Sequence, residues 1–268
     1  MKCSIVLSTQ PTTFDGVAYE GEWEQNAAKM ARLGYDGVEL AIRDPSLLDV
    51  IYVQKVLGQL HLEVPAIGTG QAYGEEGLSF TSPEERVRRR AIERIKRHVD
   101  FARTLQAMVI IGLIRGQVQK GISHEQAMGW LVAALAECLQ YAKPDVRLVL
   151  EPINRYETNL INTVADGLEC IQALGADNMG LLFDTFHANI EEVSLEEAIR
   201  TAGNRLFHVH VADSNRWYPG AGHIDFTRVI ATLRGIGYRG YLSVEAMPNP
   251  DADTCAQRSI AMIRGLCI

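Results

Sequence analysis

Short apolar runs alternate with longer amphipathic stretches eight times along the 268 residues of this chain. Each run is rich in Val, Ile and Leu and has the length of a buried strand, and each is followed by apolar residues at helical spacing. The alternation predicts repeated βα units around a parallel sheet. Eight units in a chain of this length indicate a (β/α)8 TIM barrel that occupies residues 1–268 as a single domain. Counting alone also allows a doubly wound open sheet.

The boundaries of these units follow from local signals. Gly34, Gly175 and Gly237 each lie between a helical pattern and the next apolar run, where a helix commonly ends in a glycine. The clearest helices run from Pro83 to Leu105 and from His124 to Tyr141. The expected strands are 3–8, 37–41, 64–69, 108–113, 147–151, 179–184, 206–213 and 240–246.

Composition and charge restrict the class of partner. The formal net charge of -7 repels nucleic acid and anionic membrane surfaces, so neither is an expected partner. The five cysteines are spread along the chain without a Cys-x-x-Cys pair, which is typical of a protein in the reducing cytoplasm. The apolar run at the N-terminus is too short for a signal peptide or a membrane span. We therefore expect a cytoplasmic protein.

Acidic and imidazole side chains occur at the ends of four consecutive apolar runs. Glu151, Asp184 and Glu245 close three of these runs, and His210 lies in the fourth. In a barrel, the carboxyl ends of the strands open on one face, where reactive residues are placed. Three carboxylates brought together there need a cation to compensate them. The pattern predicts one divalent metal ion, and the oxygen-rich set favours Mn²⁺, with Mg²⁺ or Co²⁺ also accepted.

Each of these residues has a simpler explanation when it is taken alone. A single Glu after a strand is more often a solvated loop residue or an ion-pair partner. Four such residues in consecutive units are difficult to explain as coincidence. His208 shares a strand face with His210 and could supply a fifth ligand, but we expect it to be a hydrogen-bonded core residue one layer deeper.

Four strings in the second half of the chain form a recognisable signature. They are EPINRYE from Glu151, DTFHANIEE from Asp184, HVADSNR from His210 and SVE ending at Glu245. In order and spacing they resemble the tagatose 3-epimerase group of the xylose isomerase-like TIM barrels, and the resemblance covers nearly the whole chain. Two further strings, AIRDP at 41–45 and IGTGQAY at 67–73, are similar to those of epimerases that act on 5-keto-L-gluconate in inositol breakdown.

The resemblance implies a metal-dependent epimerase. The metal would be held by Glu151, Asp184, His210 and Glu245. Glu151 and Glu245 would also be the catalytic pair, one removing the proton from C3 of a sugar and the other returning a proton from the opposite face. Residues that bind substrate in the family match Glu157, His187 and Arg216.

The expected substrate-binding residues also have structural alternatives. Arg216 and Glu157 could simply pair with each other, and His187 could cap a helix. Trp217 and Phe186 are either walls of the pocket or ordinary core aromatics, and the sequence leaves both readings open.

A keto-acid substrate would need a cation for its carboxylate. Arg43 and Arg115 each follow a strand on the expected active face. We therefore favour a 5-keto-L-gluconate-like substrate bound by these two arginines. The alternative is that both form ion pairs at the rim with Glu39, Asp44 or Glu76.

Other activities occur on the same barrel. Endonuclease action on abasic DNA is disfavoured, because it requires several zinc ions and a basic surface, whereas this chain has seven histidines and a negative net charge. An aldose-ketose isomerase, a hydroxypyruvate isomerase, an inosose dehydratase and a non-catalytic sugar-binding barrel stay open. The resemblance also implies a small-molecule sugar or keto sugar acid as partner, and a homo-oligomer.

Overall fold

The computed structural model describes residues 1–13 and 16–267, and within them the strands close into a barrel. Eight parallel strands follow one another around the sheet in chain order, and β1 pairs with both β3 and β9. These strands are β1 (Lys2–Ser8), β3 (Gly37–Ala41), β4 (Ala66–Gly68), β5 (Met108–Ile111), β6 (Leu148–Leu150), β7 (Met179–Asp184), β8 (Leu206–Val211) and β9 (Tyr241–Val244). A short strand, β2 (Tyr19–Glu20), also pairs with β1. Closure of the sheet confirms the predicted (β/α)8 barrel.

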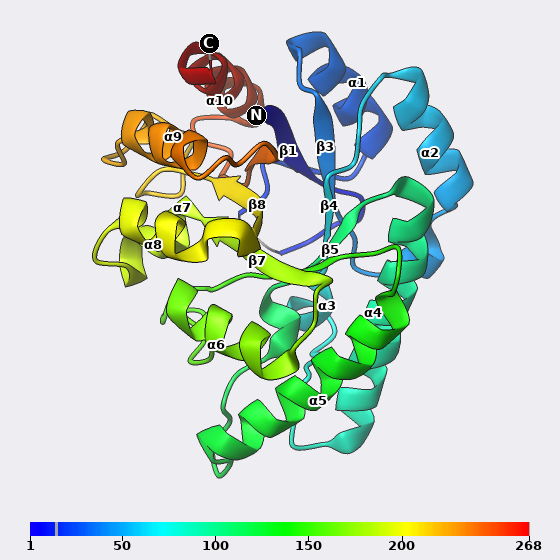
Figure 1. Ribbon diagram of the computed structural model, residues 1–268. Coiled ribbons are helices and arrows are strands. Elements are labelled where there is room, and N and C mark those ends of the chain that lie inside the picture. Colours follow the sequence, from blue (N-terminus) through cyan, green and yellow to red (C-terminus); the bar gives the residue numbers. More distant parts are fainter. Residues whose placement is uncertain (14–15, 268) are drawn as a thin grey trace.

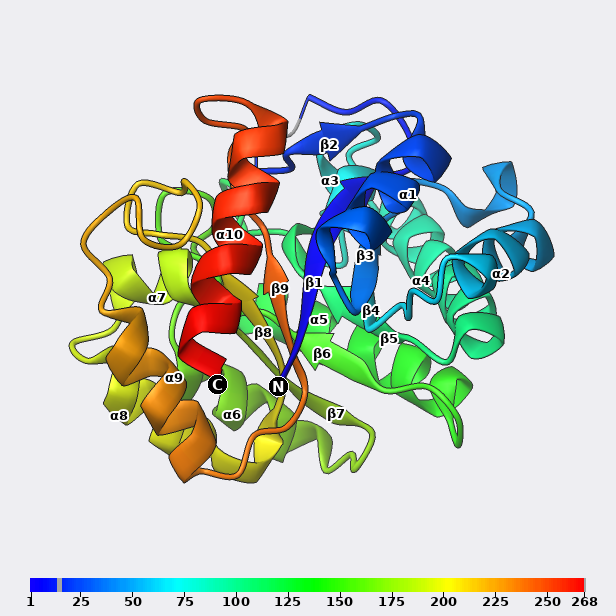
Figure 2. The ribbon, with the colours of Figure 1, turned by 90° about the horizontal axis from the view of Figure 1, so that it is seen from above.

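Helices surround the strands as an outer ring (Figure 1). They are α1 (Trp23–Leu33), α2 (Val50–Gln59), α3 (Gln71–Gly74), α4 (Glu85–Leu105), α5 (His124–Ala142), α6 (Val164–Leu174), α7 (Thr185–Glu191), α8 (Leu195–Ala202), α9 (Phe226–Gly235) and α10 (Ala252–Cys267). Three 3-10 helices are η1 (Pro45–Leu47), η2 (Leu113–Arg115) and η3 (Gly203–Arg205). Both termini lie at the lower end of the barrel in Figure 2, and the carboxyl ends of the strands point to its upper end.

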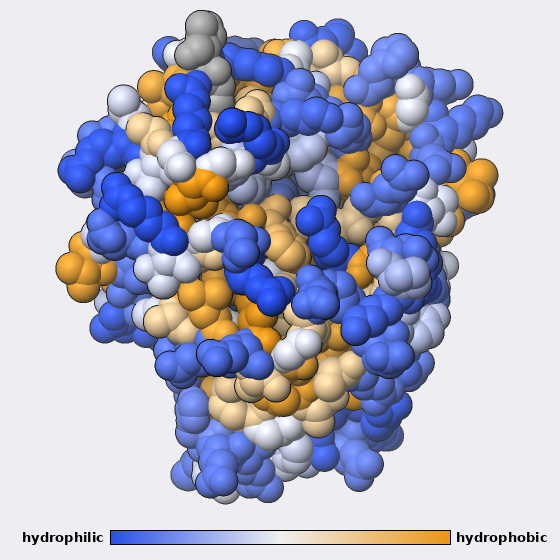
Figure 3. Space-filling view, viewed as in Figure 1, coloured by the Kyte–Doolittle hydropathy of each residue, from blue (hydrophilic) through white to orange (hydrophobic). Residues whose placement is uncertain are grey.

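Helix α4 shows why the amphipathic stretches are helices. Ala91, Ile95, Val99 and Ala102 recur at three- and four-residue spacing and are fully buried. The remaining positions of α4 are largely charged. On the face of the molecule in Figure 3, hydrophilic side chains cover much of the outer surface, and apolar ones gather nearer the middle. Among the described helices, none combines the length and apolar composition that crossing a membrane requires.

The glycine signals are confirmed. Gly34, Gly175 and Gly237 adopt φ of 88°, 59° and 78°, a region that residues with a side chain rarely enter, and each follows the end of a helix. Several expected strands are shorter in the structure than their apolar runs. The run that contains His210, for example, is a strand only to Val211, because Asp213 turns into a loop in which its carboxylate accepts hydrogen bonds from backbone N–H groups.

Candidate metal centre

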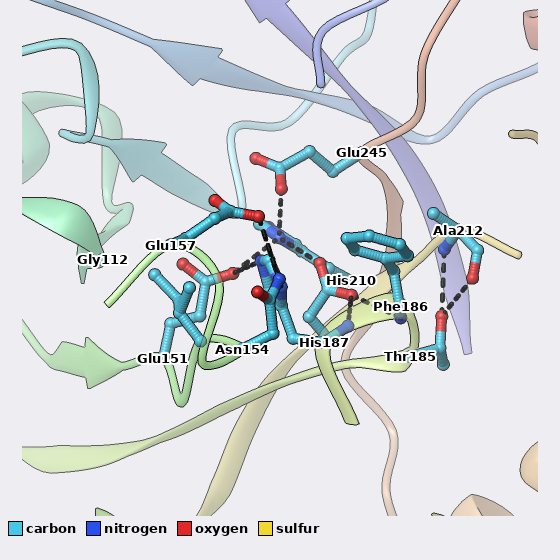
Figure 4. A network of polar contacts seen from close by, with 12 residues as sticks. Gly112, Glu151, Asn154, Glu157, Thr185, Phe186, His187, His210, Ala212 and Glu245 are labelled. Atoms are coloured by element: carbon cyan, nitrogen blue, oxygen red, sulfur yellow. Dashed lines mark hydrogen bonds and ion pairs between the residues drawn. The ribbon is translucent and has the colours of Figure 1, made fainter. Parts of the chain in front are cut away.

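Three carboxylates converge on one imidazole nitrogen at the carboxyl ends of the strands (Figure 4). Nδ1 of His210, from β8, lies 3.7 Å from Oε1 of Glu151 and 3.7 Å from Oδ2 of Asp184. It lies 3.6 Å from Oε2 of Glu245. Glu151 directly follows β6, Asp184 ends β7 and Glu245 directly follows β9. The three carboxylates and the imidazole are distant in sequence, but they lie close together because their strands are neighbours in the barrel.

The donor atoms of this cluster fit a divalent cation. Among the described residues, His210 Nδ1 and Glu151 Oε1 are buried atoms without a hydrogen-bond partner. Ligand atoms about 2.1 Å from an ion are separated from one another by roughly 3 to 4 Å, which is the range found here. Without a cation, the buried carboxylates would repel each other at a large cost in free energy. Three oxygens and one nitrogen suit Mn²⁺ or Mg²⁺.

Helix α7 fixes the orientation of Asp184. Oδ1 of Asp184 accepts hydrogen bonds from the backbone N–H of Phe186 at 2.6 Å and of His187 at 3.2 Å, so the carboxylate caps the helix. Oδ2 is left to face His210. Burial opposes ionisation, but the nearby imidazoles of His187 and His210 outweigh it and hold the pKa of Asp184 below its ordinary value.

Glu39 holds His210 from the other side and was not predicted as part of the site. This residue of β3 is 1% exposed, and its Oε1 and Oε2 lie 3.0 and 3.1 Å from His210 Nε2. Oε2 also lies 2.7 Å from Nε2 of His208, which confirms the prediction that His208 is a hydrogen-bonded core residue. Burial opposes ionisation of Glu39, but His210 and His208 hold its pKa below the ordinary value. The available signal was a Glu inside an otherwise apolar strand.

A cavity of about 220 Å³ opens beside the cluster, and its lining includes Glu157, His187 and Arg216. Arg216 donates through Nη1 to Oε1 of Glu157 at 3.1 Å, and its Nη2 lies 3.8 Å from Oε2 of Glu245. The expected alternative of an Arg216–Glu157 pair is therefore present, and the pair faces the cavity. Burial disfavours the charge of Arg216, but Glu245 and Glu157 raise its pKa.

His187 is a second imidazole near the carboxylates. One of its ring nitrogens lies within 4.8 Å of carboxylate oxygens of Glu151, Asp184 and Glu245. The side chain of Asn154 fixes its protonation: Nδ2 of Asn154 lies 3.0 Å from Oε1 of Glu157 and 2.7 Å from Nδ1 of His187. Because an amide nitrogen only donates, Nδ1 of neutral His187 accepts and Nε2 carries the proton. In this arrangement Nε2 of neutral His187 is a donor and cannot bind a cation while it keeps its proton.

The structure corrects the expectation for Arg115. Its side chain is fully buried, and the guanidinium donates to the backbone carbonyls of Leu160 at 3.0 Å, Glu151 at 2.5 Å and Ile161 at 3.1 Å. Arg115 does not line the cavity. Its position after a strand suggested an outward side chain, but the turn of η2 points it under the loop that follows Glu151. Arg115 therefore supports this loop instead of binding substrate.

Arg43 is also displaced from its expected role. It is absent from the described lining of the cavity, and its Nε lies 3.8 Å from Oε1 of Glu76. This is the ion pair that the sequence left open as an alternative. The backbone carbonyl of Arg43 accepts a hydrogen bond from Arg94, which also pairs with Glu76 and Asp44. Arg43 belongs to a rim network.

The two aromatic residues that the sequence left open as pocket walls or core aromatics do not line the described cavity. The ring of Phe186 lies under the guanidinium of Arg216, with 4.9 Å between the guanidinium carbon and the ring centroid. Trp217 is 39% exposed. The apolar part of the lining comes instead from small or aliphatic residues, namely Val6, Val17, Ala41, Ile110, Leu113 and Ile153.

Comparison with known families assigns the chain. The family model described as xylose isomerase-like TIM barrel matches residues 27–266. This chain belongs to that family. An L-ribulose 3-epimerase of Mesorhizobium japonicum is 33% identical, with 92% of this chain and 83% of the relative covered. An L-ribulose 3-epimerase of Methylomonas sp. is 30% identical, with 93% of this chain and 89% of the relative covered.

Solved structures of this xylose isomerase-like family superpose on nearly the whole chain. The D-allulose 3-epimerase of Methylomonas sp., solved in complex with D-allulose, matches with a TM-score of 0.84 and 26% identity. The match covers 99% of this chain and 96% of that one. The family resemblance predicted from the sequence is thus confirmed. The 5-keto-L-gluconate detail, the cytoplasmic location and the homo-oligomer stay predictions.

Proposed function

We propose that this chain is a divalent-metal-dependent epimerase that inverts C3 of a ketose. One observation carries the proposal: the carboxylates of Glu151 and Glu245 come from β6 and β9 and face the same nitrogen of His210 from different sides (Figure 4). A reaction that removes a proton from one face of a carbon and returns one to the other needs such a pair. The 3-epimerase names of the relatives support the same reaction.

In this proposal Glu151, Asp184, His210 and Glu245 hold the ion, with Mn²⁺ favoured. A bound divalent ion supplies Lewis acidity, which polarises a carbonyl and stabilises the negative charge that develops on its oxygen. The chain has already fixed the donor atoms: Asp184 through its cap on α7, and His210 through Glu39. Donors held before binding lose little conformational entropy when the ion enters.

The proton transfers are assigned to Glu151 and Glu245. One carboxylate removes the C3 proton, and the other, in its protonated form, returns a proton from the opposite face. A single base that returned its own proton would regenerate the starting sugar. In the protein without the ion, burial and the charge of Glu151 raise the pKa of Glu245, although His210 and Arg216 oppose this.

The residues beside the cluster would position the oxygens next to the reacting carbon. Nε2 of His187, which carries the proton, lies 3.9 Å from Oε1 of Glu151 and can donate to a substrate oxygen held near that carboxylate. Arg216 lies between Glu157 and Glu245 and offers further N–H donors to the same space. The side chains of Glu157, His187 and Arg216 would bind the C1 and C2 end of the ketose.

We propose a neutral ketose in preference to the keto acid favoured from the sequence. Five carboxylates line the described cavity, from Glu39, Glu75, Glu151, Glu157 and Glu245. Arg216 is the one arginine or lysine among the described lining residues, and it is paired with Glu157. A divalent ion compensates part of this charge, but a substrate carboxylate would find no free forked cation in the described lining.

The polar lining residues around Glu75 support the same conclusion. The backbone N–H and hydroxyl of Thr13 donate to Oε1 of Glu75 at 2.7 and 2.8 Å, and the hydroxyl of Thr12 lies 3.3 Å from the same oxygen. Gln71, whose backbone carbonyl accepts from the N–H of Glu75 at 2.9 Å, also lines the cavity. Hydroxyl, amide and carboxylate groups recognise sugar hydroxyls, whereas Glu75 would repel an anion.

The test is an assay of the Mn²⁺-loaded protein in D₂O against L-ribulose, D-fructose, D-tagatose and 5-keto-L-gluconate, followed by NMR. We expect deuterium at C3, an inverted product and a preference for a neutral ketose. Aldose formation would instead indicate an isomerase, and loss of water a dehydratase. Absence of any exchange despite bound metal would contradict the epimerase. The Glu245→Gln variant is the control, because it should lose turnover.

A further inference from the structure

Glu39 and His208 form a second, deeper cluster with His210. Oε2 of Glu39 accepts hydrogen bonds from Nε2 of His208 at 2.7 Å and from Nε2 of His210 at 3.1 Å. The three side chains are 1%, 0% and 1% exposed. Glu39 comes from β3 and the histidines come from β8, so these hydrogen bonds cross the interior of the barrel.

The cluster has the composition of a metal site, but its distances indicate hydrogen bonds. Two ligands of one divalent ion with bonds of about 2.1 Å lie at least roughly 3 Å apart. The distance of 2.7 Å between His208 Nε2 and Glu39 Oε2 is shorter than this minimum separation and is typical of a charge-assisted hydrogen bond. A proton therefore lies between these two atoms.

The proton of His210 follows from the carboxylate of Glu39, which can only accept hydrogen bonds. Nε2 of His210 faces both oxygens of Glu39 and donates to them, so in the neutral ring the lone pair of Nδ1 is directed toward a cation that the three carboxylates would hold. A carboxylate can rotate about its last bond. If His208 did not donate to it, the carboxylate of Glu39 could rotate, and the His210 ring would be held in a less fixed orientation.

We propose that His208 is a positioning residue for the metal centre: by donating to Glu39 it locks the carboxylate that orients His210 with Nδ1 toward the ion. His208 touches neither the candidate ion nor the described cavity, whose lining includes Glu39 and His210 but not His208. Its effect is transmitted through one hydrogen bond to Glu39 and a second from His210 to Glu39. Outer residues of this kind typically change metal affinity 10- to 100-fold.

The experiment compares Mn²⁺ affinity of metal-free proteins by competition with a chelator. His208→Phe keeps a ring but removes the donor, and it should weaken binding 10- to 100-fold. His208→Gln keeps an N–H donor at a similar distance from the backbone and should restore most of the affinity. His98→Phe is the matched control, because His98 is equally buried but bonds to the carbonyls of Ile42 and Arg94. This control should lose stability and keep its affinity.

Unchanged affinity in His208→Phe, or an equal loss in His98→Phe, would overturn the proposal. If His208→Phe does not fold, nitrogen NMR of the wild-type protein loaded with diamagnetic Mg²⁺ decides: we expect protonated Nε2 in both His208 and His210, and a protonated Nδ1 in His210 would contradict us. The inference rests on the metal dependence proposed above. Because no substrate is added, its failure would leave the epimerase proposal standing.

Discussion

The side-chain amide of Asn154 lies 2.7 Å from Nδ1 of His187 and sets which ring nitrogen carries the proton. Asn154 is itself held, because its Oδ1 accepts from the backbone N–H of Tyr156 at 2.9 Å. Replacing it by Asp would reverse the polarity of the contact: Nδ1 of His187 becomes the donor, and in the neutral ring Nε2 then carries no proton.

We therefore expect Asn154→Asp to lower kcat by about 10²- to 10³-fold on the best ketose, since a substrate oxygen would lose its donor. Asn154→Ser, which imposes no reversed tautomer, should cost less. Steady-state kinetics of both variants measures the difference. Equal kcat values for the two variants would refute the assignment of His187 as a donor.

The buried guanidinium of Arg115 predicts a large effect on stability. Arg115→Met would leave the carbonyls of Glu151, Leu160 and Ile161 without their donor and should lower the free energy of unfolding by about 3 to 5 kcal/mol. Arg43→Met is the comparison and should cost less than about 1 kcal/mol, because the pair with Glu76 lies at the rim. Chemical denaturation measures both. A small loss for Arg115→Met would contradict its supporting role.

Gly112 offers a way to disturb Glu151 without changing its chemistry. A Cβ at this position would lie 2.8 Å from Oε2 of Glu151, so Gly112→Ala should push the carboxylate away from its place. We expect Mn²⁺ binding to weaken at least about tenfold, as for other changes that misplace a ligand. Gly129→Ala in α5 meets no atom within 4 Å and should leave affinity unchanged. Titration calorimetry with Mn²⁺ compares the two, and equal affinities would show that Glu151 tolerates the displacement.

Removal of the metal should destabilise the protein. Three carboxylates around His210 repel one another without a cation, so a chelator should lower Tm and Mn²⁺ should restore it. At about 100 times the Kd, the ion contributes about 2.7 kcal/mol. Asp184→Asn should lose this response. A scan of Tm against Mn²⁺ concentration measures it, and a wild-type Tm insensitive to both additions would argue against a metal centre.

His98 predicts how stability depends on pH. Burial lowers its pKa from 6.5 to about 4, and Arg94 acts in the same direction while two backbone carbonyls and Asp44 oppose it. Between these values the unfolded chain binds more protons, so the contribution to stability is complete above pH 6.5 and is lost as the pH falls toward 4. The loss amounts to about 3 kcal/mol. Denaturation from pH 7 to 4 should show a shallower slope for His98→Asn than for the wild type, and identical slopes would disprove the assignment.

The sequence predicted the barrel and the cluster at its mouth for the same physical reason. Parallel strands end on one face, so Glu151, Asp184 and Glu245 could be placed together from strand order alone. The outlines of the strands were less accurate, because an apolar run continues into buried loop residues such as Ala212 and Ala246. The prediction that these side chains converge required only the order of the strands, which an imprecise boundary does not change.

The roles of Glu39 and Arg115 could not be predicted from the sequence. The role of Glu39 depends on which strands face each other across the closed barrel, and this is a property of shear and tilt that no local pattern carries. The direction of Arg115 depends on a single turn of 3-10 helix, η2, whose geometry points the side chain inward. Both residues are charged and buried, and a residue's type alone favours the opposite expectation for each.

The hydrogen bond from His210 to Glu39 joins residues 171 positions apart, one in each half of the chain. The stretch from Glu151 onward contains all four proposed ligands, yet without β3 it lacks the group that orients the imidazole. In the proposed function, high affinity for the ion would therefore require the closed ring and would not be a property of either half. During refolding, the metal affinity of the native protein would therefore appear only after the first and last parts of the polypeptide have come into contact.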